Sequence, residues 1–144
     1  GDGPEGRAGR HPAMEQLRER LASTGRVLDT LDESLGMPFS VLVRDASIQR
    51  FEYCFESVWK LLQAYLVTHE GLACHSPKQC VREAFRVGLL SEEEAERWLA
   101  MADDRNLTSH TYIEAVAKAI FGRLSDHREL MRALWMRISD RMRG

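Results

Sequence analysis

The sequence predicts an all-α protein, an up-and-down antiparallel bundle of four main helices with short additional helices. Three observations favour this fold class. Apolar residues recur every three or four positions through most of the chain, which is the period of an amphipathic α-helix. Helix start and stop signals divide this pattern into segments with short connections. No useful length alternates with the period of two that is typical of a strand, so a bundle that buries its apolar stripes is expected.

The composition agrees with a single domain. The 144 residues are 44% hydrophobic, which is enough for one core. The net charge of -2 indicates neither the strongly basic surface of a nucleic-acid binder nor an acidic tail. No apolar run approaches the roughly 20 residues that a membrane span needs, so no membrane association is expected. An odd set of three cysteines without an apolar signal segment favours free thiols and a cytoplasmic location over a disulfide framework.

The first two helices follow an unpatterned N-terminal stretch. Residues 1–13 are rich in Gly, Pro and Arg, so we interpret them as a disordered leader or cloning remnant, and residues 14–144 as one domain. A first helix is predicted from Met14 to Gly36, where the pattern stops. A longer second helix is predicted with Asp45 as its N-cap. Its apolar stripe is Ile48, Phe51, Phe55, Val58, Leu62 and Tyr65.

The remaining helices each begin at a recognisable signal. Ser followed by Pro supplies an N-cap and a first helical residue, and Ser or Thr followed three positions later by Glu is a capping box. An Asp can cap a helix in the same way. These signals are Ser76-Pro77 for the third helix, Ser91 with Glu94 for the fourth, Thr111 with Glu114 for the fifth, and Asp126 with Glu129 for the last.

The segment RNLTSHTY, residues 105–112, concentrates the groups that could carry chemistry. A guanidinium is always charged and binds phosphate with several N–H donors, and an imidazole exchanges a proton near neutral pH. On one unbroken helix, five steps of about 100° would put Arg105 and His110 roughly 140° apart, too far round to act on one small substrate. The polar residues between them compete for backbone hydrogen bonds, so a helix end is predicted between 106 and 111, with His110 and Tyr112 entering the next helix.

This segment combines with several upstream motifs to form a larger pattern. The motifs are Phe51-Glu52-Tyr53, Glu56, Trp59-Lys60, Val81-Arg82-Glu83-Ala84-Phe85 and Trp98-Leu99. From Met14 to about Leu124 the chain resembles the HEPN superfamily, and most closely its branch of nucleotidyltransferase substrate-binding proteins. The resemblance implies a single HEPN-like helical domain that forms a homodimer and has a cognate minimal nucleotidyltransferase as its partner.

The resemblance also implies a chemistry for the segment. In many HEPN proteins the arginine and histidine of this motif form a ribonuclease site that needs no metal or other cofactor and is paired across the dimer. Carried over by motif, Arg105 and His110 take these catalytic roles on RNA. Tyr112 matches the tyrosine that the partner nucleotidyltransferase modifies with AMP in related toxin–antitoxin pairs. The chain would then be the toxin, and AMP on Tyr112 would silence it.

Neighbouring polar residues have supporting roles in this hypothesis. Asn106 would orient the site or donate to a phosphate. Asp103 and Asp104 would hold the arginine in place through ion pairs. In a purely structural alternative, the same ion pairs fix Arg105 and His110 merely caps a helix.

A second hypothesis keeps the fold and omits the hydrolysis. The chain would hold a substrate for the transferase in a polar groove lined by Arg105, Glu52, Glu56 and Lys60. The last three lie at four-residue spacing on one helical face, so they could equally form a solvated ladder of ion pairs. A third alternative is a dimeric interaction module without activity.

Two further clusters receive no assigned site. Cys74, His75 and Cys80 supply three possible ligands, whereas a structural zinc site takes four, so no metal site is predicted. The last helix is rich in arginine, which would suit RNA phosphates or make an ordinary solvated face. These residues are Arg123, Arg128, Arg132, Arg137, Arg141 and Arg143.

Overall fold

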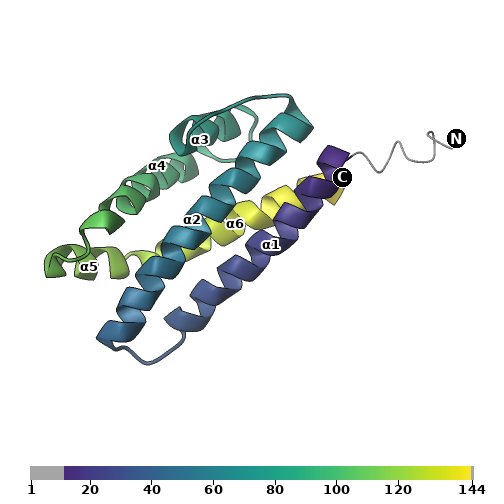
Figure 1. Ribbon diagram of the computed structural model, residues 1–144. Coiled ribbons are helices and arrows are strands. Elements are labelled where there is room, and N and C mark those ends of the chain that lie inside the picture. Colours follow the sequence, from purple (N-terminus) through teal and green to yellow (C-terminus); the bar gives the residue numbers. More distant parts are fainter. Residues whose placement is uncertain (1–11, 144) are drawn as a thin grey trace, which may run out of the picture.

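Six α-helices and a 3-10 turn make up the computed structural model, which describes residues 12–143 and has no strand within that range. They are α1 (Pro12–Leu35), α2 (Val41–Glu70), α3 (Pro77–Arg86), α4 (Glu92–Leu107), η2 (Thr108–His110), α5 (Glu114–Phe121) and α6 (Leu124–Arg143). The four longer helices run alternately up and down, and the short α3 and α5 lie toward opposite ends of the bundle (Figure 1). The predicted all-α, up-and-down fold class is confirmed.

Two helices begin earlier than predicted. α1 starts at Pro12, and the rest of the predicted leader lies outside the described residues. α2 starts at Val41, where Ser40 is the N-cap and its hydroxyl accepts a hydrogen bond from the Val43 amide at 3.0 Å. The predicted N-cap Asp45 is therefore wrong, because this residue lies inside the first turns of α2. The apolar residues at the start of α2 are exposed and do not continue the buried stripe. The hydrophobic pattern of the sequence therefore did not indicate where α2 begins.

The predicted starts of the last four helices are partly correct. Ser76 caps α3, and Ser91 with Glu94 forms the predicted capping box of α4. The capping box predicted at Thr111 is wrong, since α5 has Ile113 at its N-cap position without a side-chain cap. Glu114 accepts a hydrogen bond from Arg44 of α2 at 2.6 Å instead. α6 begins at Leu124, ahead of the predicted cap Asp126.

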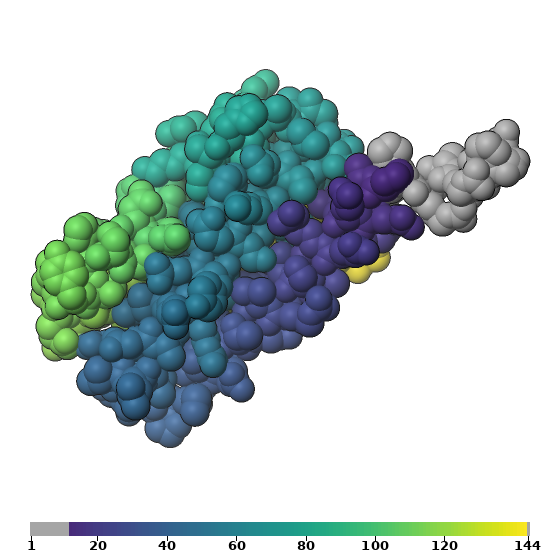
Figure 2. All heavy atoms as spheres, viewed as in Figure 1, coloured from purple at the N-terminus to yellow at the C-terminus, as the bar shows by residue number. Residues whose placement is uncertain are grey.

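The core is organised around α2, which packs against every other helix. The six residues of its predicted stripe are all buried. Trp98 of α4 is fully buried and its ring lies 5.9 Å from that of Phe55. Figure 2 shows α2 along the middle of one face of the molecule, with α1 on one side and α3 to α5 on the other. The polar side of α2 therefore faces outward between two walls.

The cysteines do not all remain thiols. Cys74 and Cys80 form a disulfide, with their Cα atoms 5.2 Å apart, which ties the loop after α2 to the first turn of α3. Cys54 is free, and burial raises the pKa of its thiol to about 12. The prediction of three free thiols is wrong for two of them, because the chain folds back between residues 74 and 80. No helix in the described range is long and apolar enough to cross a membrane.

Several arginines of α6 form ion pairs with neighbouring helices of the bundle. Arg137 makes two hydrogen bonds of 2.6 Å to Glu94 of α4, and Arg132 lies 2.9 Å from both Asp29 and Asp32 of α1. Each of the six arginines from 123 to 143 has a carboxylate partner. Their charges are balanced locally, so this helix is not a free basic surface for RNA.

The Glu94–Arg137 pair predicts a pH-dependent contribution to stability. Hydrogen bonds from Arg137 lower the pKa of Glu94 from 4.5 to about 2. Because the folded pKa is lowered, the contribution is present above about pH 4.5 and is lost as the pH falls toward 2. Arg137→Gln should lower the free energy of unfolding at neutral pH by about 1 kcal/mol, a small value because the guanidinium is 43% exposed and screened.

Urea unfolding at a series of pH values measures this effect. The difference between wild type and Arg137→Gln should shrink between pH 4.5 and 2. Arg143→Gln removes an exposed pair inside the last turn of α6 and should change stability by less than about 0.5 kcal/mol. An Arg137→Gln effect that stays constant across this acidic range would contradict the assignment.

Candidate functional site

The segment that carries the predicted site is a helix junction. α4 ends at Leu107, η2 occupies Thr108–His110, and α5 begins at Glu114. The hydroxyls of Ser109 and Thr111 donate to carbonyl oxygens three residues earlier, at 3.2 Å each, which is the competition for backbone hydrogen bonds expected from these residues. The predicted interruption between 106 and 111 is confirmed. Tyr112 was predicted to enter the next helix. This prediction is wrong, because Tyr112 lies in the turn before α5.

Arg105 lies in the last turn of α4 and faces α2. Its Nη1 is 3.6 Å from Glu52 Oε2, and its Nε is 3.7 Å from Glu56 Oε2. Its Nη1 also donates to Thr108 Oγ1 at 3.3 Å, and this hydroxyl lies 2.8 Å from Glu52 Oε2. The Nε of Arg105 is buried and donates no hydrogen bond to any residue of the described range. The guanidinium is thus oriented by two carboxylates while one of its donors stays unused.

The two aspartates that precede Arg105 do not hold it, contrary to prediction. Asp103 pairs with Lys78 at 2.6 Å. Asp104 is buried and accepts two hydrogen bonds of 2.7 Å from Arg123 and one of 2.6 Å from His127. Neighbouring residues on a helix point about 100° apart, so Asp104 and Arg105 face different partners. Asp104 therefore supports the packing of α4 on α6 rather than the arginine.

The buried aspartate is stabilised in its charged form. Burial alone would raise the pKa of Asp104, but the hydrogen bonds from Arg123 and His127 outweigh it and hold the pKa below its usual value. Sequence reasoning gave no role to His127, because no local motif connects it to a carboxylate 23 residues away. Its ring also stacks on Phe51 at 5.3 Å, which joins the network to the core.

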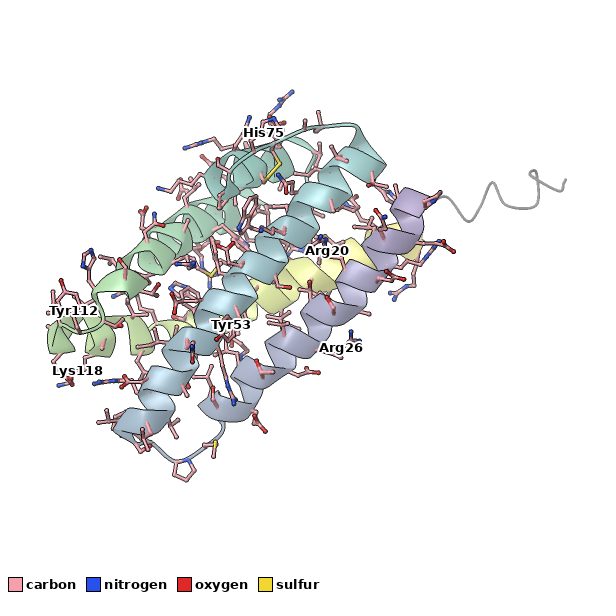
Figure 3. The ribbon with its side chains drawn as sticks, in the orientation of Figure 1. Arg20, Arg26, Tyr53, His75, Tyr112 and Lys118 are labelled. Carbon is pink, nitrogen blue, oxygen red and sulfur yellow. A yellow bond between two sulfur atoms is a disulfide. The ribbon has the colours of Figure 1, made fainter. Side chains whose placement is uncertain are left out.

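His110 and Tyr112 lie on the exposed side of the junction. The Nδ1 of His110 is 3.4 Å from the Tyr112 hydroxyl oxygen, and the two rings meet edge to face at 6.0 Å. Tyr112 is 79% exposed, and Figure 3 shows it projecting from the end of the bundle that carries α5. Both side chains are therefore accessible to a macromolecule.

Two hollows flank Glu52 on the polar side of α2. The arginine hollow has a volume of about 290 Å³ and is lined by Arg105 and Asn106 of α4, Glu56 of α2, and Ser76 to Lys78 at the start of α3. The tyrosine hollow, of about 410 Å³, is lined by Glu52, Thr111 and Tyr112 together with three residues of the first half of α2. His110 lines neither hollow. The predicted arginine and histidine are thus presented to different parts of the surface of one chain.

The predicted polar groove is partly assembled. Arg105, Glu52 and Glu56 come together, but Lys60 lies one turn further along α2 and lines a different hollow. Sequence reasoning missed Thr108, which connects Arg105 to Glu52. Its signal in the sequence was present, since a hydroxyl three residues after an arginine lies on the same side of a helix. Nothing in the sequence indicated that residues at the start of α3 would line the arginine hollow.

The fold and the site agree with the class that the sequence resemblance implied, an antiparallel helical bundle with an arginine, a histidine and a tyrosine at a break between two helices. The particular branch follows from the family match. The chain belongs to the nucleotidyltransferase substrate binding protein like family, whose model matches residues 11–140. The resemblance found in the sequence is confirmed.

Individual relatives agree with this assignment. A crystal structure of a Thermus thermophilus protein is 51% identical, with a TM-score of 0.77, over 80% of this chain and 98% of that chain. A Haemophilus influenzae structure, described as revealing the fold of a substrate binding domain of a nucleotidyltransferase, has a TM-score of 0.56 over 88% of this chain and 98% of that chain. At 24% identity it supports the fold alone.

A relative by sequence bears a functional name. It is the probable ribonuclease HepT of Haemophilus influenzae (strain ATCC 51907 / DSM 11121 / KW20 / Rd), 32% identical over 84 residues. The aligned residues are 56% of this chain and 56% of that protein, so the match spans about half of the relative.

The two neighbouring aspartates provide a matched pair for a stability test. Asp104→Asn should lower the free energy of unfolding by about 2–3 kcal/mol, because Arg123 and His127 lose a buried charged acceptor. Asp103→Asn removes only an exposed pair with Lys78 and should change it by less than about 0.5 kcal/mol. Urea unfolding at neutral pH measures both, and equal losses would contradict the assignment of Asp104 to a buried network.

Proposed function

We propose that this chain is the ribonuclease component of a toxin–antitoxin pair, cleaves RNA without a metal ion, and is controlled by a cognate minimal nucleotidyltransferase. The observation that carries the proposal is Arg105, whose side chain lines a hollow at the same helix junction that exposes His110, and whose buried Nε donates no hydrogen bond within the described residues. Its nearest acceptor is Glu56 Oε2 at 3.7 Å, which is too far for a hydrogen bond. A buried donor without a hydrogen bond is a rare feature that a ligand acceptor would satisfy. The similarity to the probable ribonuclease HepT supports the same reaction class.

The proposed reaction is a transfer within the RNA backbone. The imidazole of His110 takes the proton from a ribose 2′-hydroxyl as the 2′-oxygen attacks the neighbouring phosphorus, and it returns a proton to the departing 5′-oxygen. Arg105 donates hydrogen bonds to the phosphoryl oxygens, whose negative charge grows in the transition state. Asn106, which lines the arginine hollow, would orient the phosphate. No redox agent or added nucleophile is needed for this step.

A second copy of the chain is expected to complete the site. Arg105 lines the arginine hollow and His110 does not, so the two groups would meet on one phosphate most directly across a dimer. Large apolar side chains that a partner could cover are exposed where α1 turns into α2, including Leu42 at 82% and Phe39 at 67% exposure. The proposal therefore includes a homodimer.

The ribonuclease reaction is tested with purified protein, free of AMP, in excess EDTA. Wild type should degrade RNA under these conditions, and His110→Ala should lower the rate by about 10²–10⁴-fold because proton transfer is lost. Ser109→Ala, at the neighbouring exposed position, should retain activity because its hydroxyl only bonds to the Asn106 carbonyl. Loss of cleavage in EDTA, or full activity of His110→Ala, would show that the mechanism is wrong.

Tyr112 is proposed as the regulatory switch. Its hydroxyl is accessible to the transferase and lies 3.4 Å from His110 Nδ1. Attack of the phenol oxygen on the α-phosphorus of ATP would release pyrophosphate and leave AMP on the tyrosine, with the phenol proton passing to water. The added phosphodiester would put bulk and negative charge beside the imidazole and repel the RNA backbone.

The switch is tested by incubation with the partner transferase, ATP and Mg²⁺. Mass spectrometry should find one AMP on wild type and none on Tyr112→Phe, and cleavage by Tyr112→Phe should no longer be silenced. Tyr53→Phe removes another exposed tyrosine, on α2, and should behave as wild type. AMP on Tyr112→Phe, or silencing of that variant, would contradict the proposal.

The family description favours a second candidate function, that of a non-catalytic subunit which holds a substrate for the transferase. Its support in the structure is the pairing of Arg105 with both Glu52 and Glu56, which gives the arginine hollow mixed charge. Under this alternative, wild type would not cleave RNA, and His110→Ala would behave as wild type in cells and with RNA. Arg105→Ala would instead lower the activity of the co-purified transferase.

A further inference from the structure

A third hollow lies beside α2, between the first half of α1 and the loop after α2. This cationic hollow has a volume of about 320 Å³ and is lined by Arg20 of α1, Lys60 and Gln63 of α2, and Cys74 and His75 of the loop, with apolar residues between them. Figure 3 shows Arg20 and His75 on opposite sides of the C-terminal half of α2. Three elements therefore direct nitrogen donors into one space.

The charge of this hollow is not balanced by acids. Its lining contains no carboxylate, in contrast to the arginine hollow with Glu56 and the tyrosine hollow with Glu52. Neither Arg20 nor Lys60 forms an ion pair with any residue in the range 12–143. Most other arginines of the bundle are paired, so these two cations are available to an external anion.

The loop side of the hollow is held in a fixed conformation. Gln63 donates from Nε2 to the Cys74 carbonyl at 2.7 Å, and the His75 amide donates to Gln79 Oε1 at 2.8 Å. The Cys74–Cys80 disulfide adds a covalent connection to α3. The imidazole of His75 is thereby carried on a backbone that is anchored on both sides.

The cationic hollow continues the arginine hollow along α2. Lys60 follows Glu56 by one helical turn on the same face, and His75 is adjacent to Ser76, so the two hollows are neighbours although no lining residue is common to both. On the far side, Arg20 also lines a wider hollow of about 770 Å³ with Arg26 of α1. The wider hollow also contains Glu19, so the lining without any carboxylate is confined to the cationic hollow itself. The opposite direction along α2 leads to Asp45 and Glu52 of the tyrosine hollow.

We propose that the cationic hollow binds backbone phosphates of the RNA on one side of the cleaved bond, and so sets the direction in which the strand crosses the protein. This inference rests on the proposed ribonuclease function for the identity of the substrate. Lysine and arginine are the usual donors to phosphate oxygens, and the unpaired state of Arg20 and Lys60 means that no ion pair has to break when RNA binds. The acids of the tyrosine hollow would repel a strand on the other side.

The test measures binding separately from cleavage. In a His110→Ala background, fluorescence anisotropy with a labelled single-stranded RNA of about 20 nucleotides gives the affinity at several salt concentrations. Adding Arg20→Gln and Lys60→Gln should weaken binding about 10-fold or more at low salt and reduce the slope of log K against log salt by about 1.4, since two phosphate contacts are lost. Adding Arg18→Gln and Arg97→Gln removes the same charge from exposed positions outside the hollow and should change the affinity less than 3-fold, or about 0.6 kcal/mol.

Cleavage then distinguishes this inference from the ribonuclease proposal. With His110 intact, the Arg20 and Lys60 double variant should cleave a trinucleotide at the wild-type rate and the long RNA with lower kcat/KM, mainly through KM. Wild-type binding of the long RNA by this double variant, or an equal loss in the Arg18 and Arg97 control, would overturn the inference. If the wild type cleaves no RNA, the ribonuclease proposal fails, while a selective loss of binding would still establish the phosphate site. Matching thermal unfolding of all variants confirms that they are folded.

Discussion

The burial of one long apolar stripe on α2 is the constraint on which the rest of the structure depends. Every other helix packs against this helix, and its aromatic residues Phe51, Phe55 and Tyr65 are fully buried. An α-helix that buries one face must direct its other face outward. The outward residues of α2 recur at steps of three and four, and they line the tyrosine, arginine and cationic hollows in turn: Asp45, Gln49, Glu52, Glu56, Lys60, Gln63 and Val67. The site surface is thus the polar side of the core helix.

The distribution of ion pairs decides which parts of this surface attract anions. Basic residues are numerous in the sequence, but those of α6 are balanced by acids of α1, α2 and α4 or of α6 itself. Arg20 and Lys60 form no ion pair within residues 12–143, and no carboxylate lines the hollow that they share. A count of arginines along the sequence therefore does not identify which cations are free of carboxylate partners. The attraction of a surface for phosphate depends on cations that have no carboxylate partner. Which cations these are is decided by how the helices pack.

Local signals predicted much of this fold from the sequence. The capping box at Ser91, the Ser76-Pro77 start and the helix end between residues 106 and 111 rely on interactions within a few residues, and all are present. The errors concern partners that are distant in sequence. Arg44 and Glu114 are 70 residues apart, and their pairing replaces the capping box expected at the start of α5. Arg105 likewise found its acids on α2, not beside it in the chain, so the motif identified the arginine but could not identify what orients it.

The way Arg105 is held explains how a site with mixed charge could accept a phosphate. Its ion pairs with Glu52 and Glu56 are long, at 3.6 and 3.7 Å, and the side chains are partly exposed, so each pair stabilises the structure by no more than about 1 kcal/mol. Under the proposed function, a phosphate that offered two oxygens in bidentate geometry would form shorter hydrogen bonds, and displacement of Glu56 would free the Nε donor, which makes no hydrogen bond within the described residues. The carboxylates would then orient the guanidinium before the substrate arrives and release it at small cost. Shorter pairs to a buried carboxylate, like those that Asp104 makes, would have fixed the arginine too firmly for this exchange.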